Sequence, residues 1–366
     1  MHQLQKDPIQ SLRYWSPALF TAFIAWIALL FLGHTPIVRA SGLALAILGI
    51  TASMRRMGFV ASIGGGLTLA FCPIFWSQTG GVVSEPATIT IAIGIAGFST
   101  ILMVLISRRY YIGIGLGIAA FVGIFWSQIG TPQSLRLTGL VTAWLVYLLV
   151  DMILLTNPRP DASPPQAPKP YHTIGILFLF VIGTVNDPLL TLLIPAILLS
   201  LLLSYAKLPT WYWVVISISS IIGIGLLTNT YLLREPATMN LMGWRDATRW
   251  LDISRLIIDQ FSVLGVFLGV LGLARLSRWY PPLGTVTMIA YGAYFFLGLV
   301  FEGNYREVLL LPLLIIHVVW MTYAVNTFGQ WVNKTMKSTS HVWTHLVSGL
   351  YLILPAILLW NIIQTL

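Results

Sequence analysis

Two carboxylates in this chain have the setting of a general base at a membrane surface: Glu85 and Asp187. Glu85 follows the run Phe75-Trp76-Ser77-Gln78, and Asp187 lies in Asn186-Asp187-Pro188. Charged residues make up only 8% of the 366-residue sequence, and hydrophobic residues make up 57%. A carboxylate in such surroundings is paired, lies at an interface or has a function. We therefore take Glu85 and Asp187 as candidate catalytic bases.

Arginines that follow these carboxylates along the chain are candidate phosphate ligands, namely Arg234, Arg245 and Arg306. A guanidinium group holds a phosphate through charge-assisted hydrogen bonds. The competing interpretation is that these arginines are paired anchors at the membrane interface. Glu85 has a competing interpretation too, because Ser84-Glu85-Pro86 suits the start of a helix, where a negative charge is favourable.

Other catalytic motifs are missing from the sequence. It has no Gly-Lys-Ser/Thr phosphate loop, no His-Glu-x-x-His and no Gly-x-Ser-x-Gly, and Cys72 is its single cysteine. His317 is the histidine in the middle of an apolar run, where such a residue is more often a hydrogen-bonded packing residue than a ligand of a haem or a chlorophyll. We predict neither a cofactor nor a metal site.

The elements that must position these residues are membrane helices. Apolar runs near the length of a bilayer core recur along the whole chain. They predict an all-α polytopic membrane bundle of about thirteen spans. We place these spans at residues 15–33, 36–54, 57–76, 86–106, 111–128, 136–155, 172–185, 188–205, 210–232, 257–274, 282–301, 306–326 and 342–363.

Net charge and its distribution predict the orientation. The formal charge of +9 would favour nucleic-acid binding in a soluble protein, but here it reflects basic residues on the cytoplasmic side, and no nucleic-acid partner is expected. When the N-terminus is placed in the cytoplasm, most of the basic residues lie in segments on the cytoplasmic side of the membrane. We therefore expect an integral protein of the plasma (inner) membrane with its N-terminus in the cytoplasm and its C-terminus outside.

Proline divides the chain. The proline-rich stretch 157–171 predicts an extended cytoplasmic linker between a six-span part, residues 1–156, and a seven-span part, residues 172–366. Within the second part, Trp244, Trp250 and Leu251 recur at helical spacing opposite a charged face, which predicts a surface helix near 240–256. Asp252 with Arg255, and Arg255 with Asp259, have the spacing of intrahelical ion pairs.

Three stretches carry a family resemblance. The first runs from Leu69 through Pro73 and Trp76 to Glu85, and the second contains Asn186 and Asp187. The third runs from Gln260 to Pro312 and includes Gly265, Gly272, Arg275, Arg278 and Asn304-Tyr305-Arg306-Glu307. In order and spacing the chain resembles the GT-C class of membrane glycosyltransferases, and within it the family related to protein O-mannosyltransferases. The resemblance implies a GT-C-like fold and a polyprenyl-phosphate sugar as donor.

The chain departs from that family in its first outer loop. GT-C enzymes carry an acidic residue there, whereas this loop is Gly33-His34-Thr35-Pro36. An acceptor hydroxyl needs a base within hydrogen-bond reach. We therefore prefer a non-catalytic binding or scaffold subunit that associates with other membrane subunits and with membrane lipids. The alternative is an active transferase with Glu85 or Asp187 as base, with Arg234, Arg245 and Arg306 on the lipid phosphate, and with Asn186 and Trp76 near the substrate.

A transporter is the weakest of the three functional classes. The sequence shows no clear inverted repeat and suggests no buried charge pair in the middle of a span.

Overall fold

The computed structural model describes residues 8–80, 135–158, 165–204, 208–233, 238–303, 306–336 and 342–365. Within these ranges the regular elements are helices, and β-type pairing is limited to one isolated bridge between Met239 and Phe301. The helices are α1 (Pro8–Phe31), α2 (Ile37–Met54), α3 (Phe59–Ala70), α4 (Pro73–Trp76), α7 (Leu135–Thr156), α8 (Pro170–Asn186), α9 (Ile194–Leu203), α10 (Thr210–Leu227), α11 (Ala247–Trp279), α12 (Pro281–Val300), α13 (Arg306–Leu309), α14 (Leu311–Thr335), α15 (Val342–Tyr351) and α16 (Ile353–Thr365).

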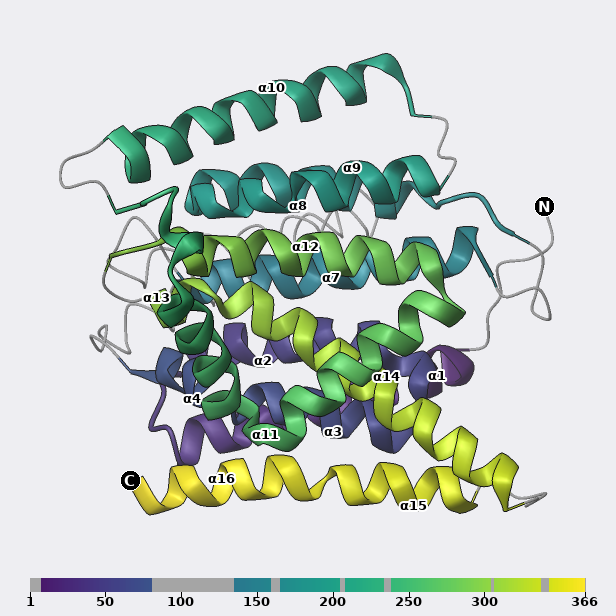
Figure 1. Ribbon diagram of the computed structural model, residues 1–366. Helices are drawn as coiled ribbons and strands as arrows, with labels where there is room; N and C mark the ends of the chain where they lie inside the picture. The colour runs from purple at the N-terminus through teal and green to yellow at the C-terminus, as the bar shows by residue number, and fades with distance from the viewer. Residues whose placement is uncertain are drawn as a thin grey trace.

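The long helices run side by side between two ends of one bundle (Figure 1). At one end, Arg55 after α2 meets Asp151 in the last turns of α7. At the other end, Thr138 at the start of α7 meets Asp187 after α8. We call these the Asp151 end and the Asp187 end. Helix α1 begins at the Asp151 end and α16 finishes at the Asp187 end, so the described chain starts and stops on opposite sides (Figure 1).

Eight of the described helical segments are long and apolar enough to cross a membrane, or nine if the bent pair α3–α4 forms one span. That pair bends by 61° around Phe71 to Pro73. Helices α8 and α9 are apolar but shorter than a full span. The predicted spans 86–106 and 111–128 lie outside the described residues, so the total of about thirteen stays a prediction.

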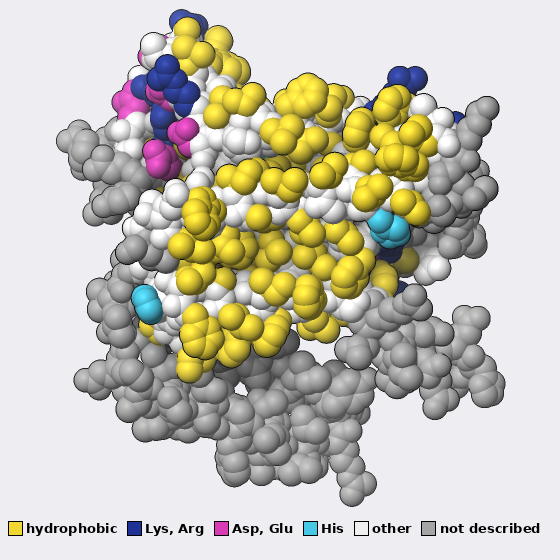
Figure 2. Space-filling view, turned by 90° about the horizontal axis from the view of Figure 1, so that it is seen from below, with side chains coloured by type: hydrophobic (Ala, Val, Ile, Leu, Met, Phe, Trp, Pro, Cys, Tyr) yellow, Lys and Arg dark blue, Asp and Glu magenta, His cyan; other side chains and the backbone are white. Residues whose placement is uncertain are grey.

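The surface of the bundle has the character of a membrane protein. On the face seen in Figure 2, hydrophobic side chains cover the middle, and charged side chains gather at the two ends. Large apolar side chains remain exposed along the sides, among them Ile221 of α10, Val270 of α11 and Trp360 of α16. Such exposure is normal where lipid takes the place of water, and it confirms the prediction of a helical membrane bundle.

Helix α14 is the centre of the bundle, since every side chain from Leu311 to Asn326 is buried. A helix that is apolar on all sides belongs in a core. Its closest neighbour is α11, and Gly272 makes this approach possible. A Cβ atom on Gly272 would lie 1.9 Å from the backbone oxygen of Trp320. Gly272, which contributes to the family resemblance, therefore serves helix packing here.

Helix α11 is 33 residues long but is broken at Ser262, whose φ of 64° and ψ of 171° are not helical. Its first part, from Ala247 to Phe261, crosses the Asp187 end of the bundle, and the remainder runs back along the bundle (Figure 1). A helix therefore exists where the surface helix near 240–256 was predicted, although it begins at Ala247. The predicted span 257–274 lies within α11, which is a candidate membrane span over its whole length, and it includes the break at Ser262.

The described part of the proline-rich stretch, residues 165–169, has no regular secondary structure, Lys169 is extended, and α8 begins at Pro170, inside the predicted linker. Helices from both sides of this stretch pack together, because α14 contacts α2, α3 and α7. The two sequence parts therefore contribute to one hydrophobic core.

Candidate functional site

The Trp76-Ser77-Gln78 run closes the bent α3–α4 span at the Asp187 end. Gln78 Nε2 donates to the Ile74 carbonyl over 3.3 Å, and the guanidinium of Arg39 in α2 donates to the carbonyls of Thr79 and Gly80, each over 2.9 Å. The start of α4 is held from α11, because the Ile74 N–H donates to Gln260 Oε1 over 2.8 Å. Trp76 is half-buried and packs on Phe71. The run thus terminates a span and joins three helices.

Asp187 lies in a buried polar network at the turn after α8. Its Oδ1 accepts from the Leu189 N–H and its Oδ2 accepts from the Thr138 hydroxyl, both over 3.0 Å. Asn186 Nδ2 donates to the same Thr138 oxygen over 3.2 Å. Asp187 is only 2% exposed, and burial raises the pKa of its carboxyl group. The first turn after Pro188 is thus capped by Asp187, as expected for an Asx residue before a 3₁₀ helix.

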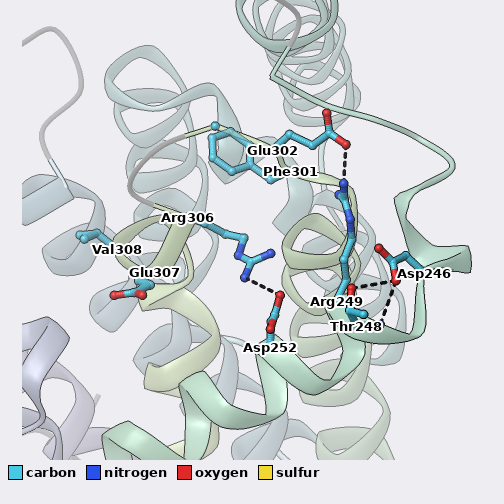
Figure 3. Close-up of a pocket in the computed structure, with 10 residues that line it drawn as sticks. Asp246, Thr248, Arg249, Asp252, Phe301, Glu302, Arg306, Glu307 and Val308 are labelled. Atoms are coloured by element: carbon cyan, nitrogen blue, oxygen red, sulfur yellow. Dashed lines mark hydrogen bonds and ion pairs between the residues drawn. The ribbon is translucent and has the colours of Figure 1, made fainter.

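An open pocket of about 710 Å³ lies at the same end of the bundle (Figure 3). It forms where the start of α11 meets the connection between α12 and α14, so its polar residues come from two segments distant in sequence. Its lining residues are Asp246, Thr248, Arg249, Asp252, Phe301, Glu302, Gly303, Arg306, Glu307 and Val308.

Ion pairs join the two sides of this pocket. Arg249 binds Glu302 and also donates to the Leu299 carbonyl over 3.0 Å. Arg306 lies 3.6 Å from Asp252 (Figure 3). These pairs connect the first two turns of α11 to the segment between α12 and α14, but both are exposed and contribute little to stability.

The pocket carries more negative than positive charge, because four carboxylates and two guanidinium groups line it. A hydrogen bond from Asn240, followed by contact with Arg249, lowers the pKa of Glu302. Hydrogen bonds from the Thr248 hydroxyl and N–H lower the pKa of Asp246, which caps α11. These carboxylates are therefore ionised at neutral pH, and the pocket disfavours an anion that arrives alone.

The structure brings together only some of the predicted site residues. Arg306 lines the pocket, whereas Asp187 and Asn186 lie in the separate buried network. Arg245 is outside the pocket lining and stacks over the Trp244 ring at 5.4 Å. Glu85 and Arg234 lie outside the described residues. The predicted pair of Asp252 with Arg255 was wrong, because Asp252 pairs with Arg306 instead.

Sequence reasoning missed a buried charge cluster at the Asp151 end. Asp151 binds Arg55 at 3.0 Å and the His172 ring at 3.2 Å, and Arg56 reaches it at 3.3 Å. The Arg55 guanidinium is 4% exposed and lies over the Tyr14 ring at 3.8 Å. This pair includes Asp151, which lies within the predicted span 136–155 near its end. A lone Asp within the apolar run 136–155 was the available signal.

His317 acts as a packing residue, as its sequence context predicted. Its ring stacks on Phe261 with 5.4 Å between centroids and 6° between planes. Its Nε2 lies 3.3 Å from the Gly265 carbonyl oxygen, and its Nδ1 lies 3.4 Å from the Tyr291 hydroxyl. Within the described ranges, no group of three or more His, Cys, Asp or Glu side chains could hold a metal ion.

Comparison with known proteins gives no relatives: no family model, curated protein or solved structure matches this chain.

Proposed function

We propose that this membrane protein is a binding or scaffold subunit of a membrane complex, with a GT-C-like fold that does not transfer sugar. The observation that carries this proposal is the state of Asp187. A general base must reach the hydroxyl that it deprotonates, directly or through one water molecule. Asp187 is buried, and both of its oxygens already accept hydrogen bonds from Leu189 and Thr138. Its geometry is that of a structural cap.

The pocket supports the same proposal. Two of its carboxylates, Glu302 and Asp252, are engaged by arginines, which leaves neither group free as a base. The same pairing weakens the case for Arg306 as a phosphate ligand, because Asp252 would compete with the phosphate. Charge complementarity instead favours a basic group of a partner subunit at this open and negatively charged surface.

The alternative is a transferase that uses a polyprenyl-phosphate sugar, and the size of the pocket favours it. An open volume of about 710 Å³ has room for a small polar ligand. In this alternative Glu85 is the base, since Asp187 is occupied. Arg306 would exchange Asp252 for the lipid phosphate, while Arg234 and Arg245 would contribute charge from outside the pocket.

We further propose that the Asp151 end is cytoplasmic, which places the N-terminus inside and the C-terminus outside. Basic side chains near the helix termini of this end are Arg55, Arg56, Lys169, Arg275, Arg278 and Lys334. Among the described residues of this end, Asp151 is the acidic partner available to them. An excess of Lys and Arg marks the cytoplasmic side of membrane proteins.

Purified protein in lipid nanodiscs, supplied with polyprenyl-phosphate sugars, tests catalysis. Variants Glu85→Gln and Asp187→Asn are compared with Glu307→Gln, a matched carboxylate change at an exposed pocket position. The scaffold proposal expects no transfer by any of these proteins. Robust transfer that Glu85→Gln lowers by about 10²–10⁴-fold would establish the alternative.

Association is tested separately on complexes extracted from native membranes in mild detergent. The proposal expects a complex that survives Glu85→Gln and Asp187→Asn but is weakened by Glu307→Arg, which reverses a pocket charge. A chain that is monomeric in native membranes, with or without these changes, would contradict the scaffold role.

A further inference from the structure

The first part of α11, Ala247–Phe261, has three distinct sides. Its buried side packs on the bundle through Ile253, Leu256 and Ile257. Around the helix from there, Trp250, Leu251 and Ile258 form an apolar flank, and two of its members, Trp250 and Leu251, are 46% and 60% exposed. The remaining flank is polar and consists of Thr248, Asp252, Arg255 and Asp259, all of them exposed.

Helix length separates this part from the span that follows. The full α11 would be about 50 Å long as a straight rod, whereas a bilayer core is about 30 Å thick. The break at Ser262 divides it, and the second part exposes Val263, Phe267 and Val270 to the lipid side. The first part carries charges that a bilayer core would exclude, so a continuous span is not possible.

The loop before α11 extends the apolar flank. Leu241, Met242 and Trp244 are all exposed, and Trp250 Nε1 donates to the Trp244 carbonyl over 2.8 Å. Trp244 also supports the Arg245 guanidinium at 5.4 Å. Tryptophan with a neighbouring arginine is typical of the membrane–water interface, where the ring is half in hydrocarbon and its N–H is hydrogen-bonded.

We propose that Ala247–Phe261 is an interfacial helix whose apolar flank, with Trp244, is docked into the headgroup and upper acyl layer of the lipid bilayer. Its polar flank faces water and the pocket, and the membrane span of α11 begins only after Ser262. Lipid is the occupant that the geometry favours, because the flank continues the lipid-facing surface of the bundle while the opposite flank is charged. The assignment is independent of whether the chain transfers sugar.

Depth measurements on single labelled cysteines test the proposal. Cys72 is buried and unpaired, so a Cys72→Ala background leaves no competing thiol. Leu251→Cys, Arg255→Cys and Val270→Cys each receive a polarity-sensitive fluorophore, in nanodiscs of palmitoyl-oleoyl phosphatidylcholine. Iodide quenches labels in water, and lipids with a nitroxide high or low on the acyl chain quench labels at matching depths.

The label at position 251 is expected to be quenched by the shallow nitroxide and about threefold less by iodide than the label at 255, since an interfacial helix sits roughly 5–10 Å into the boundary. The label at 270 should respond to the deep nitroxide. Equal iodide quenching at 251 and 255 would overturn the proposal, and so would protection at 251 without nitroxide quenching, because protein would then cover the flank. Ile258→Cys, on the same flank, replaces Leu251→Cys if that variant fails to fold.

Discussion

Replacing Asp151 by Asn should destabilise this protein more than any other single charge removal at a described position. The carboxylate receives Arg55 at 3.0 Å, Arg56 at 3.3 Å and the His172 ring at 3.2 Å. An amide of the same shape keeps one acceptor oxygen but removes the negative charge. The buried guanidinium of Arg55 is then left without a counter-charge, with only aromatic rings such as that of Tyr14 around it.

The magnitude follows from burial. The Arg55 and Asp151 side chains are 4% and 9% exposed, so water cannot replace the lost partner. Breaking a buried ion pair from one side costs about 3–5 kcal/mol, because the other charge stays buried and uncompensated. Contact of Arg55 with the Tyr14 ring at 3.8 Å is made with or without the Asp151 charge, so it does not reduce this cost. We therefore expect a loss of about 3–5 kcal/mol.

Denaturation in mixed detergent micelles, followed by tryptophan fluorescence, measures this loss. Asp252→Asn is the control, because it also removes the carboxylate of an arginine pair, but at an exposed site with 3.6 Å between the charged groups. That control should cost less than about 1 kcal/mol. Adding Arg55→Met to Asp151→Asn should restore part of the stability, since the unpaired charge is gone. Equal losses for Asp151→Asn and Asp252→Asn, or no recovery in the double variant, would refute the reasoning.

Three further outcomes are expected. Ser262→Gly should raise the midpoint of thermal unfolding, because a backbone with φ of 64° and ψ of 171° costs a non-glycine residue about 1–3 kcal/mol. A lowered midpoint would mean that the backbone at the bend is not strained. Gly272→Ala should destabilise the protein by about 1–3 kcal/mol, because the added methyl group would collide with the backbone of Trp320. Gly292→Ala in α12 is the control and should be neutral or stabilising, because nothing lies within 4 Å of the added methyl group. Equal effects of the two substitutions would contradict the close packing of α11 on α14. The pKa of Glu302 is lowered in the folded state. Its ionised carboxylate therefore stabilises the fold above the ordinary Glu pKa of 4.5, and this stabilisation is lost as the pH falls below 4.5. Protection from hydrogen exchange around Arg249, taken relative to the intrinsic exchange rate at each pH, should therefore fall below that pH in the native chain but not in Glu302→Gln, and an identical pH response in both would exclude Glu302 as the cause.

Local sequence patterns predicted the class of fold and the crossing helix. Apolar runs of spanning length predict membrane helices directly, and the alternation of Trp250 and Leu251 with charged residues marks an amphipathic segment. The break in α11 had no such signal. Sharp bends usually occur at Pro or Gly, but this one occurs at Ser262, between Phe261 and Val263. The position of the bend therefore cannot be predicted from a local Pro or Gly signal.

The candidate site was harder to predict because its contacts are non-local. Arg306 was predicted as a phosphate ligand or a paired anchor, but its partner Asp252 comes from a different helix. Spacing favoured the intrahelical pairing of Asp252 with Arg255, and the tertiary pair won because the connection before α14 brings Arg306 against α11. For Asp187, sequence analysis identified the acid but could not predict its buried hydrogen bond with Thr138 from α7.

The distribution of hydrogen bonds narrows what any catalytic activity would need. Among the described carboxylates at the Asp187 end, those of Asp259 and Glu307 alone make no hydrogen bond or ion pair, and both side chains are exposed. A base gains catalytic power from a fixed position and partial exclusion of water, and a solvated surface carboxylate has neither. The remaining acids of this end hold turns, helix starts and arginines in place. Of the two bases proposed for an active transferase, Asp187 is thus occupied, so Glu85→Gln is the substitution that best separates the two functions proposed for this chain.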